Sequence, residues 1–230
     1  MSLTLPKKNV RNWYRFDVVF SIELLESYIE GVEEQADESI IRFKKEKQTH
    51  VLEEYPEEGY ARVVDVHQGL DDESWDLETI FGEYFPSLQR RSALLTVCGF
   101  FEHELDKLCL LYQKEKQFKL SLSDLKDKGI DRSTSYLEKV PGINAHKDSS
   151  EWSHIKKIQK IRNVIVHQDG KLHDHQGNLV KAAFDYIKEI ESLSGDAEVV
   201  LQKGFLKHVV DIYKQYFCKI SESIEAAEKA

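Results

Sequence analysis

The sequence predicts an all-α fold, an up-down helical bundle with an N-terminal helical extension. Four long segments repeat apolar residues every three or four positions, the spacing that gives a helix one buried face. The shorter segments between them hold most of the glycines and the prolines Pro56 and Pro141, residues that interrupt helices. A chain of 230 residues is long enough to bury one substantial core, so these helices are expected to pack together.

The first long helix is predicted from residue 16 to about residue 54, after a loose tail over residues 1–12. No proline interrupts this stretch before Pro56, and the acidic run from Glu30 to Glu38 fits its solvent-facing side. Residues 55–72 are predicted to be a connection. Within it, Tyr60–Val66 alternates weakly and is a candidate short edge strand.

A helix from Ser74 to Tyr84 is expected next, and Pro86 then fits the first turn of another helix, where a missing N–H leaves no hydrogen bond unmade. That helix, residues 86–116, is the most apolar in the chain and the expected packing partner of residues 149–170. We therefore divide the chain into an acidic helical extension, residues 1–85, and a bundle, residues 86–230, on which the extension packs.

The second half of the chain is predicted to contain two short helices, Leu122–Lys128 and Arg132–Val140, separated by Gly129. Residues 178–201 show no clear period, although Glu198–Leu201 fits an extended segment. The last long helix is predicted from about Gln202 to Ala226.

Charge is unevenly distributed along the chain. The net charge of −9 argues against a general polyanion binder. Residues 1–90 hold 10 Lys and Arg against 20 Asp and Glu, whereas residues 91–230 hold 22 against 21. The helix at residues 149–170 is locally basic, so a single phosphate group remains a plausible ligand there.

Two further features bear on localisation. No run approaches the ~20 apolar residues that span a bilayer, and the N-terminus lacks an apolar signal region, so a cytoplasmic protein without membrane contact is expected. Cys98, Cys109 and Cys218 are unclustered and lie in apolar helical patterns. They are expected to be reduced core residues that form neither a disulfide framework nor a zinc site.

The segment from Ser149 to Gly170, SSEWSHIKKIQKIRNVIVHQDG, is predicted to be a largely buried helix. Ser149 or Ser150 can cap its start, and Asp148 with Glu151 is an alternative capping pair. Gly170 suits a left-handed stop after the last turn. The residues that recur on its apolar face are Ile155, Ile158, Ile161 and Ile165.

A second face of this helix is polar. Lys160, Asn163 and His167 recur at helical spacing, so Asn163 and His167 lie one turn apart, and Arg162 is adjacent to Asn163. A purely structural interpretation is that His167 caps the helix end and that Arg162 pairs with a carboxylate such as Glu102 or Glu104.

The longer sequence around Arg162, Asn163 and His167 favours a functional role for these residues. IKKIQKIRNVIVHQDGKL, preceded by the apolar LLTVCGFFEHELDKLC, resembles the HEPN superfamily (higher eukaryote and prokaryote nucleotide-binding domains) over about residues 86–226. The resemblance implies a bundle of four to five helices. It also implies a motif of an arginine, an adjacent polar residue and a histidine four to six positions after the arginine, here Arg162, Asn163 and His167.

Many HEPN proteins are metal-independent endoribonucleases of toxin–antitoxin, abortive-infection or CRISPR systems, and they act as homodimers whose motif helices face each other. The resemblance thus implies a homodimer that cleaves RNA without a cofactor or metal, and an antitoxin or other system partner. His167 would move a proton and Arg162 would stabilise the phosphate. Asn163 would orient His167 or hold a phosphate oxygen, while Lys160 and Lys157 would bind the substrate.

A second hypothesis is a non-catalytic HEPN module that binds nucleotide or RNA or assembles with proteins. HEPN toxins paired with nucleotidyltransferase antitoxins often have a tyrosine two positions after the histidine, and here that position is Asp169, which argues against control by tyrosine nucleotidylation.

Two patterns that could indicate metal sites are less specific than the Arg162–His167 motif. Glu151-x-x-His154 has di-iron spacing but no second copy, and His173-Asp174-His175 fits a polar turn better than a rigid ligand set.

Overall fold

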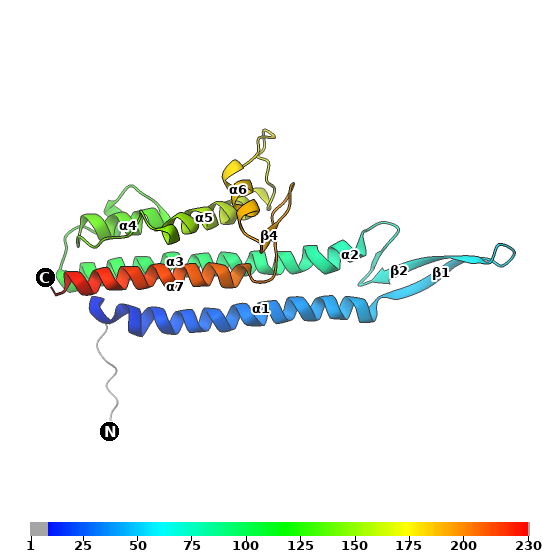
Figure 1. The fold of residues 1–230 in the computed structure, drawn as a ribbon, viewed down its shortest axis with the longest axis horizontal. Helices are drawn as coiled ribbons and strands as arrows, with labels where there is room; N and C mark the ends of the chain where they lie inside the picture. Colours follow the sequence, from blue (N-terminus) through cyan, green and yellow to red (C-terminus); the bar gives the residue numbers. More distant parts are fainter. Residues whose placement is uncertain (1–8, 230) are drawn as a thin grey trace, which may run out of the picture.

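The computed structural model describes residues 9–229 and is mostly helical, with a small three-stranded sheet (Figure 1). Three long helices lie along the long axis and pack on one another: α1 (Val19–Glu46), α3 (Phe85–Lys116) and α7 (Phe205–Ala227). Two further helices pack against this group, α4 (Gly129–Lys139) on α3, and α5 (Ser150–Gln168) on α3 and α7. The prediction of a mostly helical fold is therefore confirmed, and the small sheet is an addition to the predicted bundle.

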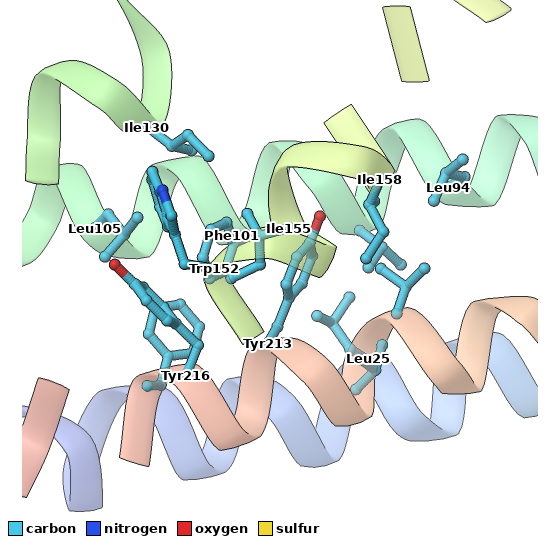
Figure 2. Close-up of a cluster of buried hydrophobic side chains, with 14 of the residues drawn as sticks. Leu25, Leu94, Phe101, Leu105, Ile130, Trp152, Ile155, Ile158, Tyr213 and Tyr216 are labelled. Carbon is cyan, nitrogen blue, oxygen red and sulfur yellow. The ribbon is translucent and has the colours of Figure 1, made fainter. Parts of the chain in front are cut away.

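One core runs between these helices and includes α1. Figure 2 shows Leu25 of α1, Phe101 of α3 and Ile155 of α5 in the same buried cluster. At its centre Phe101 stacks on Tyr213, with 4.0 Å between the ring centroids. Because α1 buries its apolar face in the bundle core, the N-terminal part of the chain is held by the same hydrophobic energy as the rest.

The chain leaves α1 in a β-hairpin that projects beyond the helices (Figure 1). β1 (Gln48–Tyr55) pairs antiparallel with β2 (Tyr60–His67), and β2 pairs with β3 (Leu70–Asp71). The helix predicted to reach residue 54 is thus wrong from Gln48 onward. The candidate strand at Tyr60–Val66 is confirmed as β2, which is the central strand and not an edge.

The error has a local cause. After Phe43, which is fully buried, the helical spacing of apolar residues stops, and Thr49 and Val51 are β-branched residues that favour a strand. At the base of the hairpin, Phe43 stacks on Phe81 at 5.0 Å, and His67 meets Phe81 edge-on at 4.6 Å. This second small core joins the sheet to the helices.

The segment before α3 is also helical. α2 (Leu77–Thr79) is capped by Asp76, whose Oδ1 accepts from the Thr79 N–H at 3.0 Å, and it continues through the π-helical η3 (Ile80–Tyr84) into α3. The expected helix at Ser74–Tyr84 therefore starts at Leu77. The proposed division between residues 85 and 86 falls inside one uninterrupted helical stretch.

The remaining connections are short elements. They include η1 (Val10–Asn12), η2 (Tyr14–Val18), η4 (Leu122–Asp124), α6 (Lys181–Glu189), β4 (Leu193–Ser194) and β5 (Val200–Leu201).

Several sequence predictions can be compared with these elements. The helix predicted near Arg132–Val140 is confirmed as α4, and the extended segment near Glu198–Leu201 as β5, but Leu122–Lys128 forms only the single turn η4, and α6 was not predicted. The predicted tail is wrong for residues 9–12, because η1 buries Val10; its residues 1–8 lie outside the described part.

The three cysteines carry free thiols; Cys109 is buried, and Cys98 and Cys218 are half-buried. Within residues 9–229, no helix combines the length and apolar character that a bilayer crossing requires.

Candidate phosphate-binding site on α5

The start of α5 is fixed by a side-chain cap. The Ser149 hydroxyl accepts the Trp152 N–H at 3.2 Å, which confirms Ser149 among the predicted capping residues. Glu151 instead forms an ion pair with Lys219 of α7 at 2.8 Å. The bond to Lys219, and after it a hydrogen bond from the backbone N–H of Glu151 itself, lower the pKa of the Glu151 carboxyl.

The end of α5 is fixed by a left-handed turn, as predicted. Asp169 (φ +53°) and Gly170 (φ +82°) follow the last helical residue, and the Gly170 N–H donates to the Val164 carbonyl at 3.1 Å. The two caps define the length of the helix that carries Arg162, Asn163 and His167.

Arg91 of α3 holds this end of α5 against the bundle. Its guanidinium pairs with Glu198 at 2.6 Å and donates to the carbonyls of Asp169 and Val199. A Cβ added at Gly170 would lie 2.7–2.9 Å from the guanidinium atoms, so any larger residue would displace this guanidinium. This buried arginine was not singled out from the sequence, although a charge within the most apolar helix signals a residue that needs fixed partners.

Both predicted faces of α5 are present. Ile155, Ile158 and Ile161 are fully buried, and Ile165 is partly buried against the same core. The polar side chains that were predicted to share the other face are exposed: Lys160, Asn163 and His167.

A pocket of about 580 Å³ opens beside this polar face, between α5, α3 and the start of α4. Arg162, Asn163 and Lys160 line it, and the Arg162 Nη1 donates to the Asn163 Oδ1 at 3.1 Å. This hydrogen bond holds the guanidinium and the amide as one donor-rich unit, the kind of group that binds phosphate oxygens.

The pocket carries a positive balance. Among the described residues that line it, Lys128 and Lys156 join Lys160 and Arg162, whereas Glu102 and Asp131 are the carboxylates. Lys156 and Asp131 neutralise each other in an ion pair of 2.6 Å.

Glu102 packs against the first residue of α4. Its carboxylate lies 3.4–3.6 Å from the position that a Cβ would occupy on Gly129, the first residue of that helix. The positive end of a helix favours a carboxylate at such a place.

The ion pair that a purely structural role of Arg162 predicts is not present: among residues 9–229, no ion pair joins Arg162 to Glu102 or Glu104. Glu104 is buried and binds Lys107 at 2.7 Å instead. Arg162 is half-buried and stays open to the pocket.

The floor of the pocket is neutral. Tyr213, which is fully buried, donates to the Cys98 Sγ at 3.3 Å. Burial raises the pKa of Cys98 to about 11, so this cysteine stays a thiol at neutral pH and is a poor nucleophile.

The other predicted site residues lie elsewhere. His167 is exposed in the last turn of α5, one turn beyond Asn163, and does not line the pocket. Lys157 points to a different side of the helix, where its ammonium pairs with Glu189 of α6 at 2.5 Å and lies 5.5 Å from the centre of the Tyr186 ring. The structure therefore brings Arg162, Asn163 and Lys160 together, sets His167 beside them and separates Lys157.

Sequence reasoning missed Lys128 and Lys156 as part of this group. Lys156 precedes Lys160 by one turn, which was a usable signal. Lys128 comes from the loop before α4, and only the packing of α4 on α3 brings it to the pocket.

The two metal-site patterns have other partners. His154 Nδ1 lies 3.4 Å from the Tyr186 hydroxyl, while Glu151 binds Lys219. Asp174 accepts the backbone N–H groups of Gln176 and Asn178 and so closes a polar turn. Within residues 9–229, no group of three or more His, Cys, Asp and Glu side chains is arranged to hold a metal ion.

Comparison with family models, with curated proteins and with solved structures found no match to this chain.

Proposed function

We propose that this chain is an endoribonuclease of the HEPN type that cleaves without a metal, and that its substrate phosphate binds in the pocket beside Arg162. The observation that supports it most is the cationic pocket itself. Arg162 faces it and forms no ion pair with a carboxylate of residues 9–229, and Asn163 and Lys160 line the same wall.

The residue types suit the proposed chemistry. The ribose 2′-hydroxyl attacks the adjacent phosphorus and loses its proton, a new P–O2′ bond forms, the P–O5′ bond breaks, and the 5′ oxygen gains a proton. An imidazole titrates near neutral pH and can take or give such a proton, and we assign this role to His167. The forked donors of Arg162 stabilise the charge that builds on the phosphate oxygens.

Because His167 does not line the pocket of its own chain, a homodimer could supply the histidine from the partner subunit. The exposed face of α5 carries Lys160, Asn163 and His167 in one row, so two α5 helices that face each other would add the partner's histidine to each pocket. Lys157, which is paired with Glu189, would contact the RNA strand only outside the pocket. The enzyme would act in the cytoplasm, under the control of an antitoxin or another system partner.

The cleavage test uses single-stranded RNA in the presence of EDTA. Wild-type protein should cut it, and His167→Ala should lower the rate at least about 100-fold, the usual contribution of a general acid or base. His175→Ala is the matched control, because His175 is also exposed but belongs to the turn after α5. Equal cleavage by wild type and His167→Ala would refute the catalytic assignment.

A non-catalytic RNA- or nucleotide-binding module is the second candidate. The position of His167 outside the pocket favours it, because the pocket can hold a phosphate without that histidine. RNA binding that requires Arg162, with no cleavage at any protein concentration, would select this function.

A further inference from the structure

β1 and β2 form a hairpin arm, residues 48–67, that extends past the end of the bundle, and one edge of β1 on this arm is open (Figure 1). The sheet order is β1-β2-β3, so β2 covers one edge of β1 and, among the described strands, none covers the other. All residues of β1 except Tyr55 are exposed. An uncovered edge presents backbone donors and acceptors that can pair with another strand.

The arm also exposes aliphatic side chains. Val51 lies directly opposite Val63 on β2, so these two side chains share one face of the hairpin. They are 55% and 49% exposed, and the neighbouring Leu52 is 47% exposed. Water contact of three adjacent aliphatic residues is unfavourable, and a covering strand would relieve it.

Charge along the arm indicates what covers it. The end of α1 at the base of the arm exposes Lys44, Lys45 and Glu46, a balance of +1, whereas the tip exposes Glu54, Glu57 and Glu58. In an antiparallel pair of arms the acidic tip of each copy lies beside the basic base of the other. A parallel pair would instead place like charges together, which is unfavourable.

We infer that the arm binds a second copy of this chain, by antiparallel pairing of the two β1 edges about a two-fold axis at Val51. With the axis at Val51, Val51 meets Val51 of the partner subunit, and the acidic end of each strand, beyond the bulge between Val51 and Glu53, lies beside the Gln48–His50 end of the other strand. A two-fold axis nearer the tip would bring glutamates against glutamates. Because the arm projects beyond the helices, the two bundles of such a pair lie at opposite ends, so this contact is separate from the α5–α5 contact proposed above and joins a different pair of copies.

This inference does not depend on the proposed nuclease function. It is tested by reversing charges on the arm and measuring self-association by sedimentation velocity. Wild type should self-associate in a concentration-dependent way, and Glu54→Lys/Glu57→Lys should weaken the association through the arm at least about tenfold by repulsion from Lys44 and Lys45. Adding Lys44→Glu/Lys45→Glu to that variant should restore the dimer. The control Lys114→Glu/Lys139→Glu changes exposed charges on α3 and α4 and should have no effect.

A cysteine placed on the proposed axis gives an independent readout. Opposed residues of antiparallel strands have Cα atoms about 4.5–5.5 Å apart, within the range for a disulfide, so Val51→Cys should form a covalent dimer on mild oxidation. Lys126→Cys, exposed in the loop before α4, is the control. A monomeric wild type, a dimer unaffected by the charge reversal, or Val51→Cys that cross-links no faster than Lys126→Cys would overturn the inference.

Discussion

At the end of α5, the buried guanidinium of Arg91 packs against the backbone of Gly170. This contact fixes the last turn of the helix that carries the candidate site. Gly170 adopts φ +82° and leaves no room for a Cβ, because Arg91 occupies that space. Arg91 in turn satisfies backbone carbonyls beyond the helix. The orientation of the last turn of α5, and with it His167, follows from these two residues.

Gly170→Ala should therefore lower the free energy of unfolding by about 3 kcal/mol. A left-handed alanine costs about 1–2 kcal/mol, and displacing a buried arginine from its hydrogen bonds costs a further ~1–3 kcal/mol. Gly177→Ala is the control, because Gly177 has nearly the same φ, +81°, and no atom of the described part of the chain lies within 4 Å of an added Cβ. Urea denaturation of both variants measures the difference, and equal losses would show that the Arg91 contact is unimportant.

At the scale of elements, the packing of α1 on α3 includes a buried ion pair. Arg90 Nε binds Glu33 Oε2 at 2.8 Å, and the two side chains are 6% and 15% exposed. The Arg90 Nη1 also donates to the Leu201 carbonyl at 3.4 Å. Removing one partner of such a pair leaves a charge without compensation in the interior.

Glu33→Gln should accordingly destabilise the protein by about 3 kcal/mol. Glu34→Gln, which changes an exposed neighbour on the same helix, should stay within about 0.5 kcal/mol of wild type. Thermal or urea unfolding of the two variants checks the prediction. A loss at Glu33 no larger than that at Glu34 would mean that α1 does not depend on this pair.

A second inter-element contact joins α5, α6 and α7 and is sensitive to pH. The Tyr186 hydroxyl lies 3.4 Å from His154 Nδ1 and 3.3 Å from His208 Nε2. Burial, followed by the nearby His154, lowers the pKa of His208, while Asp211 and Glu189 act in the opposite direction. The folded protein therefore binds a proton at His208 less readily than the unfolded chain does.

The free energy of unfolding should consequently fall as the pH drops below about 7, through the unfolded histidine pKa of about 6.5. His208→Gln should remove that part of the pH dependence, because glutamine does not titrate. His103→Gln, at an exposed histidine of α3, should leave it unchanged. Urea titrations at pH values on either side of this range make the comparison, and identical slopes for wild type and His208→Gln would contradict the assignment.

At the scale of the molecule, the sequence predicted the long helices and the polar face of α5, because apolar spacing and helix caps are local signals. Ser149 and Gly170 act as predicted for that reason. β1 was missed, although its partner β2 was a candidate strand, because the charged residues after Phe43 suit an exposed helix as well as a strand, and strand pairing depends on residues farther along the chain. The pocket beside Arg162 was not predictable, since Lys128 and Glu102 reach it only through the packing of α3, α4 and α5.

The claim that unites the two candidate functions is that the pocket beside Arg162 binds an RNA phosphate. Fluorescence anisotropy with a single-stranded RNA that carries 2′-O-methyl groups, and so cannot be cleaved, measures this binding without turnover. Arg162→Ala should weaken binding at least about tenfold and reduce its dependence on salt, since one phosphate contact is lost. Arg42→Ala, an exposed arginine of α1, should bind like wild type. Equal affinities for wild type and Arg162→Ala, or no RNA binding by wild type, would contradict the account.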